Sequence, residues 1–201
     1  KLDDGIDTFS TYDYFKDCRV VLFVVPGAFT PTCSAKHLPG YVKYADKLKA
    51  AGIDKIACMA VNDAHVMRAW AEASDAVGVI DMIADLHAEM SDALGLTRDM
   101  GPIMGRRAAR CAMVIDHGVV QSIFMEEPGA FEVSSAEHVL AHWLQSGAEV
   151  HAMRRLTAIN MHQHEQRADK RIGCAAPVSC CHSAVVKDAT RSDVPVLQLW
   201  E

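Results

Sequence analysis

The sequence predicts an α/β domain with three layers, in which a central mixed sheet is flanked by helices. Five short apolar stretches have the length and the residue types of buried strands. Segments with helical spacing separate most of these stretches, and the pattern ends in a hairpin and a last helix. Strands that alternate with helices in this way favour a sheet covered by helices.

The expected strands are apolar and often β-branched, as in the run VVLFVV. They cover residues 20–25, 55–61, 79–84, 112–115 and 119–125. The sequence Asp116-His117-Gly118 connects the last two strands, and its residue types are typical of a hairpin turn.

The expected helices cover residues 43–51, 64–76, 87–94 and 135–144. Gly52 closes the first and Gly95 closes the third, because glycine readily adopts the conformation that follows a helix. Trp70 lies on the apolar face of the second helix, and Trp143 lies on that of the fourth.

The composition excludes several classes of function. The chain has 201 residues, half of them hydrophobic, and no apolar stretch approaches the length of a transmembrane helix. Its net charge of -6 argues against nucleic acid or an anionic membrane as the main partner. Its seven cysteines show no framework spacing, which favours a reducing compartment with free or catalytic thiols.

We expect two parts in the chain. Residues 1–147 would form the α/β domain, and residues 148–201 would form a C-terminal extension that is partly helical or of low order. The extension contains Cys174, Cys180, Cys181 and His182, which raises the question of a zinc site. Zinc sites usually pair cysteines with two residues between them, so this spacing fits poorly and we expect no metal.

Cys33 lies where a nucleophile is commonly placed. The first strand ends at Pro26, and Pro31 would begin a helix with Thr30 as its N-cap. Cys33 then falls in the first turn, where unpaired backbone N–H groups and the helix dipole favour a thiolate. A buried structural cysteine is the alternative.

Residues 26–41, PGAFTPTCSAKHLPGY, resemble the active-site signature of the peroxiredoxins, and in particular their type V branch with the plant type II enzymes. The segments IACMAVNDAHVM and EEPGAFEVSSAEHVL are similar to the same branch. The resemblance covers roughly residues 6 to 146 and implies a thioredoxin-like fold. Relatives usually carry one more strand before the equivalent of Ile6, and the chain begins at Lys1 without methionine, so we expect that an upstream segment was removed or is missing.

The resemblance implies roles for four residues. Cys33 would be the peroxidatic nucleophile, and Thr30 would offer its hydroxyl to the peroxide. Pro26 would shield the thiolate from water, which strengthens every charge interaction in the pocket. Arg110 would match the family's catalytic arginine because it directly precedes a strand, with Arg107 as the alternative. A guanidinium keeps its charge and can hold both the thiolate and a peroxide oxygen.

Two main routes remain open for resolving the sulfenic acid that the attack would leave on Cys33, and a cysteine of the C-terminal extension is a minor third one. Cys58 matches the second cysteine of the plant type II enzymes, but a small buried hydrophobe is an equally good interpretation. In other type V relatives the resolving cysteine lies in a loop that matches residues 132–135, where this chain has none. Reduction by glutathione, glutaredoxin or thioredoxin would need no second cysteine. Cys111 stands where relatives usually have an aromatic residue.

The resemblance therefore implies a thiol-dependent peroxidase for hydrogen peroxide and small alkyl hydroperoxides, with a role in antioxidant defence and redox homeostasis. It implies a homodimer, no metal, haem or flavin, and a cytoplasmic or organellar location. A disulfide reductase is disfavoured, because that activity normally needs a cysteine where Thr30 stands. A non-catalytic redox-sensing or holdase-like binding protein is the alternative from another class.

Overall fold

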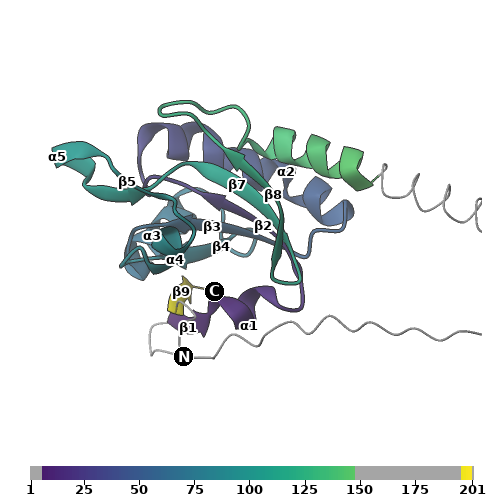
Figure 1. The fold of residues 1–201 in the computed structure, drawn as a ribbon, viewed down its shortest axis with the longest axis horizontal. Helices are drawn as coiled ribbons and strands as arrows, with labels where there is room; N and C mark the ends of the chain where they lie inside the picture. Colours follow the sequence, from purple (N-terminus) through teal and green to yellow (C-terminus); the bar gives the residue numbers. More distant parts are fainter. Residues whose placement is uncertain (1–5, 148–195, 201) are drawn as a thin grey trace, which may run out of the picture. The chain divides into compact units, whose positions relative to one another are not determined.

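A computed structural model describes residues 6–147 and 196–200 of the chain (Figure 1). These residues form a seven-stranded mixed sheet and a separate two-stranded hairpin. Across the large sheet the strands are β1 (Ile6–Ser10), β9 (Val196–Trp200), β4 (Asp81–Ala84), β3 (Lys55–Ala60), β2 (Arg19–Val24), β7 (Cys111–Asp116) and β8 (Val119–Met125). The central β2, β3 and β4 run parallel, and β7 is antiparallel to β2.

Helices cover both faces of this sheet. One core contains buried residues of α2 (Leu38–Ala50), α3 (Ala64–Ala73) and the helical residues 136–147. The other core contains buried residues of α1 (Thr11–Phe15) and α4 (Glu89–Ala93). The predicted three-layer, thioredoxin-like architecture is confirmed.

Strand β2 shows how the sequence produces these two cores. Val21 and Phe23 face the core that contains α2, whereas Val20 and Leu22 face the core that contains α1. All four are fully buried, because side chains alternate between the faces of a strand and here both faces are covered. The run therefore lacks the polar alternation of a half-exposed strand.

The five predicted strands correspond to β2, β3, β4, β7 and β8, with bounds that differ by a few residues. Helix α2 begins at Leu38 rather than residue 43, and Pro39 lies in its first turn, where no N–H is needed. Helix α3 ends at Ala73, three residues early, and α4 keeps only five residues. The remaining elements, which the sequence analysis did not predict, are β1, α1, β9 and the hairpin of β5 (Thr97–Asp99), α5 (Gly101–Met104) and β6 (Arg106–Ala108).

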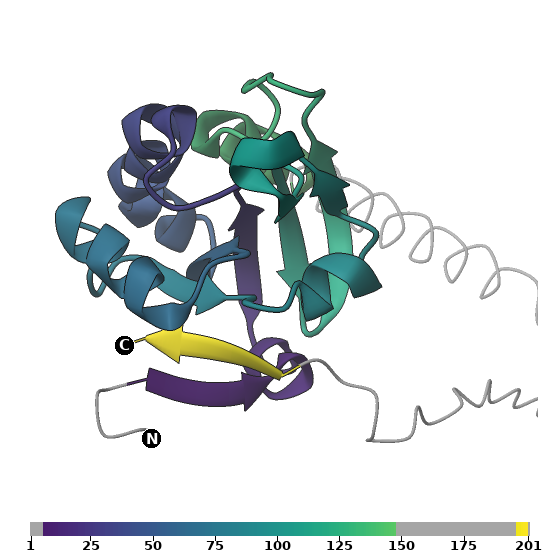
Figure 2. The same cartoon turned by 90° about the vertical axis from the view of Figure 1, so that its left-hand side faces the viewer.

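Strand β9 belongs to the part of the chain that the sequence analysis assigned to an extension. It lies between β1 and β4 in the large sheet (Figure 2). It also falls in the same compact unit as residues 1–143. The rest of the expected extension, residues 148–195, lies outside the described residues.

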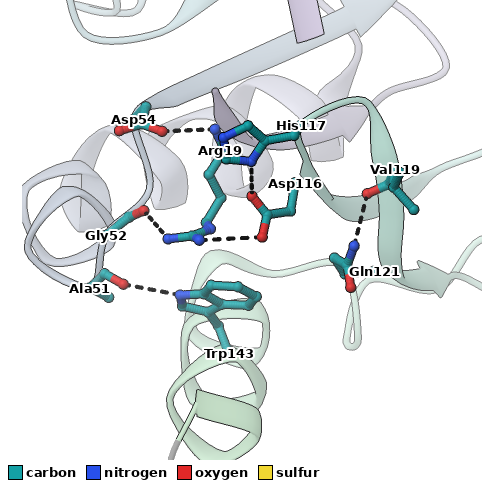
Figure 3. Close-up of polar contacts among 9 residues, drawn as sticks. All are labelled: Arg19, Ala51, Gly52, Asp54, Asp116, His117, Val119, Gln121 and Trp143. Atoms are coloured by element: carbon teal, nitrogen blue, oxygen red, sulfur yellow. Dashed lines mark hydrogen bonds and ion pairs between the residues drawn. The ribbon is translucent and has the colours of Figure 1, made fainter. Parts of the chain in front are cut away.

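Arg19 joins several elements at the end of the sheet where β2 begins (Figure 3). Its guanidinium donates to the Gly52 carbonyl after α2 (3.0 Å) and pairs with Asp116 at the end of β7 (3.2 Å). It also lies over the ring of Trp143, 5.2 Å from the centroid. Cys33 follows the opposite end of β2, so this cluster stabilises the scaffold far from the candidate site.

Within the described part of the chain, no helix combines the length and the apolar character that crossing a bilayer requires.

Candidate active site

Cys33 is held by the segment that leaves the carboxyl end of β2. Val25 extends the strand by donating its N–H to the Met59 carbonyl of β3 (3.0 Å), and the Ala28 N–H donates to the Asn62 side chain (3.0 Å). Phe29 adopts a left-handed conformation (φ 59°), which is uncommon for a non-glycine residue and turns the chain sharply toward Cys33. Cys33 itself is fully buried.

The backbone at Cys33 forms a π-helix rather than the regular first turn that the sequence predicts. The π-helical segment η1 covers Cys33–His37 and continues directly into α2. The Leu38 N–H bonds to the Cys33 carbonyl, five residues back. Such single-turn widenings are frequent at functional sites. Here the wider turn carries both Cys33 and His37 toward the buried side.

Arg110 lies directly before β7 and reaches Cys33 from there. Its Nη2 lies 3.4 Å from the Cys33 Sγ, and its Nη1 donates to the His37 Nδ1 (2.9 Å). The guanidinium also lies over the ring of Phe131, 5.8 Å from the centroid. One arginine thus contacts the sulfur and a buried imidazole at once, although 77 residues separate it from the cysteine.

His37 is a neutral imidazole that fixes the arginine. Arg110 can only donate, so Nδ1 must accept, and the proton therefore lies on Nε2, which donates to the Ser134 carbonyl (3.0 Å). Burial, reinforced by the Arg110 charge, lowers the pKa of His37 to about 3. The neutral imidazole therefore accepts a hydrogen bond from the Arg110 guanidinium and adds no second positive charge beside it.

Glu126 supports the same network through the loop that contains Ser134. One oxygen of its carboxylate accepts from the N–H and the hydroxyl of Ser134 (2.7 and 2.8 Å) and from the Glu132 N–H (2.7 Å). Burial opposes ionisation of Glu126, yet these hydrogen bonds hold its pKa below the usual value. Tyr41 also donates to the Ser134 carbonyl (3.0 Å). The sequence patterns did not identify His37, Tyr41, Glu126 or Ser134 as site residues. The signal for His37 and Tyr41 was their place inside the signature at residues 26–41.

A cavity of about 820 Å³ opens beside this network. Its walls come from the loop after β2, the β5–α5 hairpin and the loop after β8, with Pro26, Thr30 and Arg110 among the lining residues. The Thr30 hydroxyl donates to the Gly27 carbonyl (2.9 Å), so its lone pairs remain to accept from a bound molecule. The structure thus brings together four sequence-predicted candidates: Cys33, Arg110, Thr30 and Pro26.

The other sequence candidates lie elsewhere or are fully buried. Arg107, the alternative to Arg110, donates to the carbonyls of Met104 (2.8 Å) and Val61 (2.7 Å). Cys58 on β3 belongs to the same core as Cys33, and burial raises its pKa well above the usual value. Burial also raises the pKa of Cys111 to about 12.

No group of three histidine, cysteine or acidic side chains within residues 6–147 could hold a metal ion. The cysteines of the expected extension, at positions 174, 180 and 181, lie outside the described residues.

We expect the buried His37 to make the protein sensitive to mild acid. The unfolded chain takes up a proton near pH 6.5, whereas the folded protein does so only near pH 3. Between these values the unfolded state binds more protons, so stability falls as the pH falls. The free energy of unfolding, measured with urea, should drop by about 2 kcal/mol from pH 7 to pH 5 because of this group alone.

The His37→Gln variant should lose this pH dependence, because glutamine does not titrate. His87→Gln serves as the control, because it replaces an exposed histidine that is not part of the network around Arg110. An identical slope in wild type and His37→Gln would contradict the assignment.

Comparisons with known proteins agree with this geometry. The chain matches the Redoxin family over residues 1–140. It is 40% identical to Peroxiredoxin-2B of Arabidopsis thaliana over 139 residues, which cover 69% of this chain and 86% of that protein. A solved structure of reduced Prx3 from Vibrio vulnificus, in complex with H2O2, is 51% identical. Its TM-score is 0.66, over 68% of this chain and 84% of that chain.

The matched region is shorter than some of these relatives. Peroxiredoxin-2E-2 of Oryza sativa, a chloroplastic protein, is 46% identical over 143 residues, and the chain spans 63% of its length. The chain spans 53% of the Arabidopsis thaliana Peroxiredoxin-2E.

Proposed function

Because this chain belongs to the Redoxin family, among the peroxiredoxins of the plant type II kind, we propose that it is a thiol-dependent peroxidase. Its substrates are hydrogen peroxide and small alkyl hydroperoxides, and its role is antioxidant defence and redox homeostasis in a reducing compartment, cytoplasmic or organellar. One observation carries the proposal: the Arg110 guanidinium lies 3.4 Å from the Cys33 Sγ, beside a cavity lined by Thr30.

The peroxidatic step follows from these positions. The Cys33 thiolate attacks one peroxide oxygen, so that an S–O bond forms and the O–O bond breaks. The leaving oxygen takes a proton and departs as water or an alcohol, and Cys33 becomes a sulfenic acid. Arg110 stabilises the thiolate before the attack and the charge on the leaving oxygen during it, as a preorganised donor does. Thr30 accepts from the peroxide hydroxyl, and Pro26 excludes water.

Peroxide-dependent oxidation of NADPH tests the proposal. The full chain is assayed with glutathione, glutaredoxin and glutathione reductase, and separately with thioredoxin and thioredoxin reductase. We expect turnover in at least one system. Absence of turnover in both, and with dithiothreitol as donor, would instead favour the non-catalytic sensing or holdase-like alternative.

We propose that an external thiol, rather than Cys58, resolves the sulfenic acid. Cys58 is fully buried on a central strand, and its raised pKa keeps it a protonated, poorly nucleophilic thiol. Cys58→Ser should therefore retain turnover with glutathione and glutaredoxin to within about threefold.

Peptide mass spectrometry of the oxidised wild type provides the complementary measurement. The expected adduct after treatment with peroxide and glutathione is a mixed disulfide on Cys33. A Cys33–Cys58 disulfide, together with lost turnover in Cys58→Ser, would identify Cys58 as the resolving residue instead.

We further propose a homodimer that forms through apolar residues near the cavity. Ile103 on α5 is 95% exposed, more than any other large apolar residue whose burial the structure describes, and Phe29 in the loop after β2 is 55% exposed. Sedimentation of the wild type should give a dimer, and Ile103→Glu should shift it to monomer. Val77→Glu is the control, because Val77 is 47% exposed in a turn after α3. A dimer that survives Ile103→Glu would contradict this interface.

A further inference from the structure

Strand β9 lies between β1 and β4 in the large sheet, and we call the space between these two strands the slot. In Figure 2 β9 is the yellow arrow beside the purple β1. It pairs with β1 from Ile6↔Trp200 to Ser10↔Val196, and with β4 from Met82↔Trp200 to Ala84↔Gln198. Both ladders are antiparallel, so the same short segment uses both of its backbone edges.

The attachment of β1 to the sheet depends on this strand. Among the described strands, β9 is the neighbour through which β1 joins the sheet, and β4 lies on the far side of β9. Without β9, β4 would present a row of unpaired N–H and C=O groups, which is a template for pairing with another strand. The gap therefore accepts an extended segment about five residues long.

The covalent connection does not oblige β9 to dock on its own domain. Residues 148–195, 48 in number, separate it from the last described residue of the preceding helix. A chain of 48 residues spans up to about 160 Å when extended. A strand of five residues is only about 17 Å long, so the connection is long enough for the strand to reach a neighbouring molecule.

We propose that the slot between β1 and β4 is a strand-acceptor site, and that it takes the Val196–Trp200 strand of a second copy of this chain as well as its own. Main-chain hydrogen bonds on two edges supply the affinity, as in other cases of strand addition. Two copies that exchange this strand each complete the other's sheet, which is the geometry of a domain swap. Cys33 follows β2, and the strands β4 and β3 lie between the slot and β2, so exchange leaves the candidate active site in place.

The full-length Gln198→Pro variant opens the slot for a test. Gln198 is in register with both Thr8 and Ala84, and proline removes its N–H from the ladder. A fluorescent peptide with the sequence of residues 193–201 is titrated into this variant and into the wild type. We expect at least tenfold tighter binding to the variant, whose own strand no longer competes. The same peptide with proline at position 198 should not bind.

A second experiment identifies the occupant. Tagged Gln198→Pro chain is mixed with untagged chain, both carrying Ile103→Glu to remove the proposed dimer interface, and the captured untagged chain is then challenged with unlabelled 193–201 peptide. Release of the untagged chain by the peptide shows that its strand occupies the slot. Capture that saturating peptide leaves unchanged would overturn exchange between copies.

The far-ultraviolet circular dichroism spectrum, compared with that of the wild type, reports whether the variant is folded. If Gln198→Pro does not fold, isotopically labelled peptide is incubated with the wild type and its incorporation is followed by native mass spectrometry. The temperature of the incubation is chosen so that the backbone amide hydrogens of β1 and β4 exchange with solvent, which shows that the slot opens transiently. Equal binding to variant and wild type in the first design, or no incorporation in this one, would overturn the proposal.

Discussion

Replacing Cys33 by serine should abolish the rapid reaction with hydrogen peroxide in a stopped-flow experiment. The second-order rate constant is expected to fall by about a thousandfold or more, to the level of the other thiols, because a hydroxyl is far less nucleophilic than the thiolate it replaces. The loss should be specific to Cys33, because the Arg110 guanidinium lies 3.4 Å from its sulfur.

Cys111→Ser is the matched control for this loss. Cys111 is also fully buried and begins β7, one residue after Arg110, but burial raises its pKa to about 12 and keeps it protonated. Its substitution should leave the rate within about twofold of wild type. Equally slow reactions of wild type and Cys33→Ser would refute the peroxidatic role of Cys33.

Replacing Arg110 by glutamine should lower the same rate constant by about 10²- to 10³-fold, which is typical when one preorganised donor to a developing charge is removed. Glutamine keeps a donor but loses the positive charge and the fork that reaches both Cys33 and His37. Arg110→Lys should recover part of the rate, because it restores the charge without the fork.

Arg106→Gln controls for the general loss of one positive charge near the cavity. Arg106 is exposed on β6 and pairs with Asp92, away from the sulfur. Its substitution should change the rate by no more than about twofold, in keeping with the small worth of exposed pairs. Equal losses in Arg106→Gln and Arg110→Gln would mean that the effect is a long-range field and not a contact with the reacting atoms.

The sequence predicted the centre of the sheet well, because its strands are encoded locally. Strand β2 is buried on both faces, so its sequence is the continuous apolar run VVLFVV, which by itself predicts a buried strand. Strand β1, IDTFS, was missed because its burial is partial and its composition is mixed. Strand β9 was missed because it is defined by pairing with segments that lie more than a hundred residues earlier.

The candidate site divides in the same way. The signature PGAFTPTCS is contiguous, so Cys33, Thr30 and Pro26 could be named from local sequence. The direction of an arginine side chain is not a local property. Arg107 and Arg110 are three residues apart, yet the first donates to the Val61 carbonyl and the second to Cys33.

The fold class followed from the alternation of strands and helices along the chain, and the family and the place of the candidate nucleophile followed from short runs of residues. The tertiary structure was needed to show that a π-helix carries Cys33, that neutral His37 and the Glu126–Ser134 loop hold Arg110, and that Val196–Trp200 completes the sheet. These features arise where segments distant in sequence meet. Burial and hydrogen-bond partners there are set by packing and not by the periodicity of any one segment.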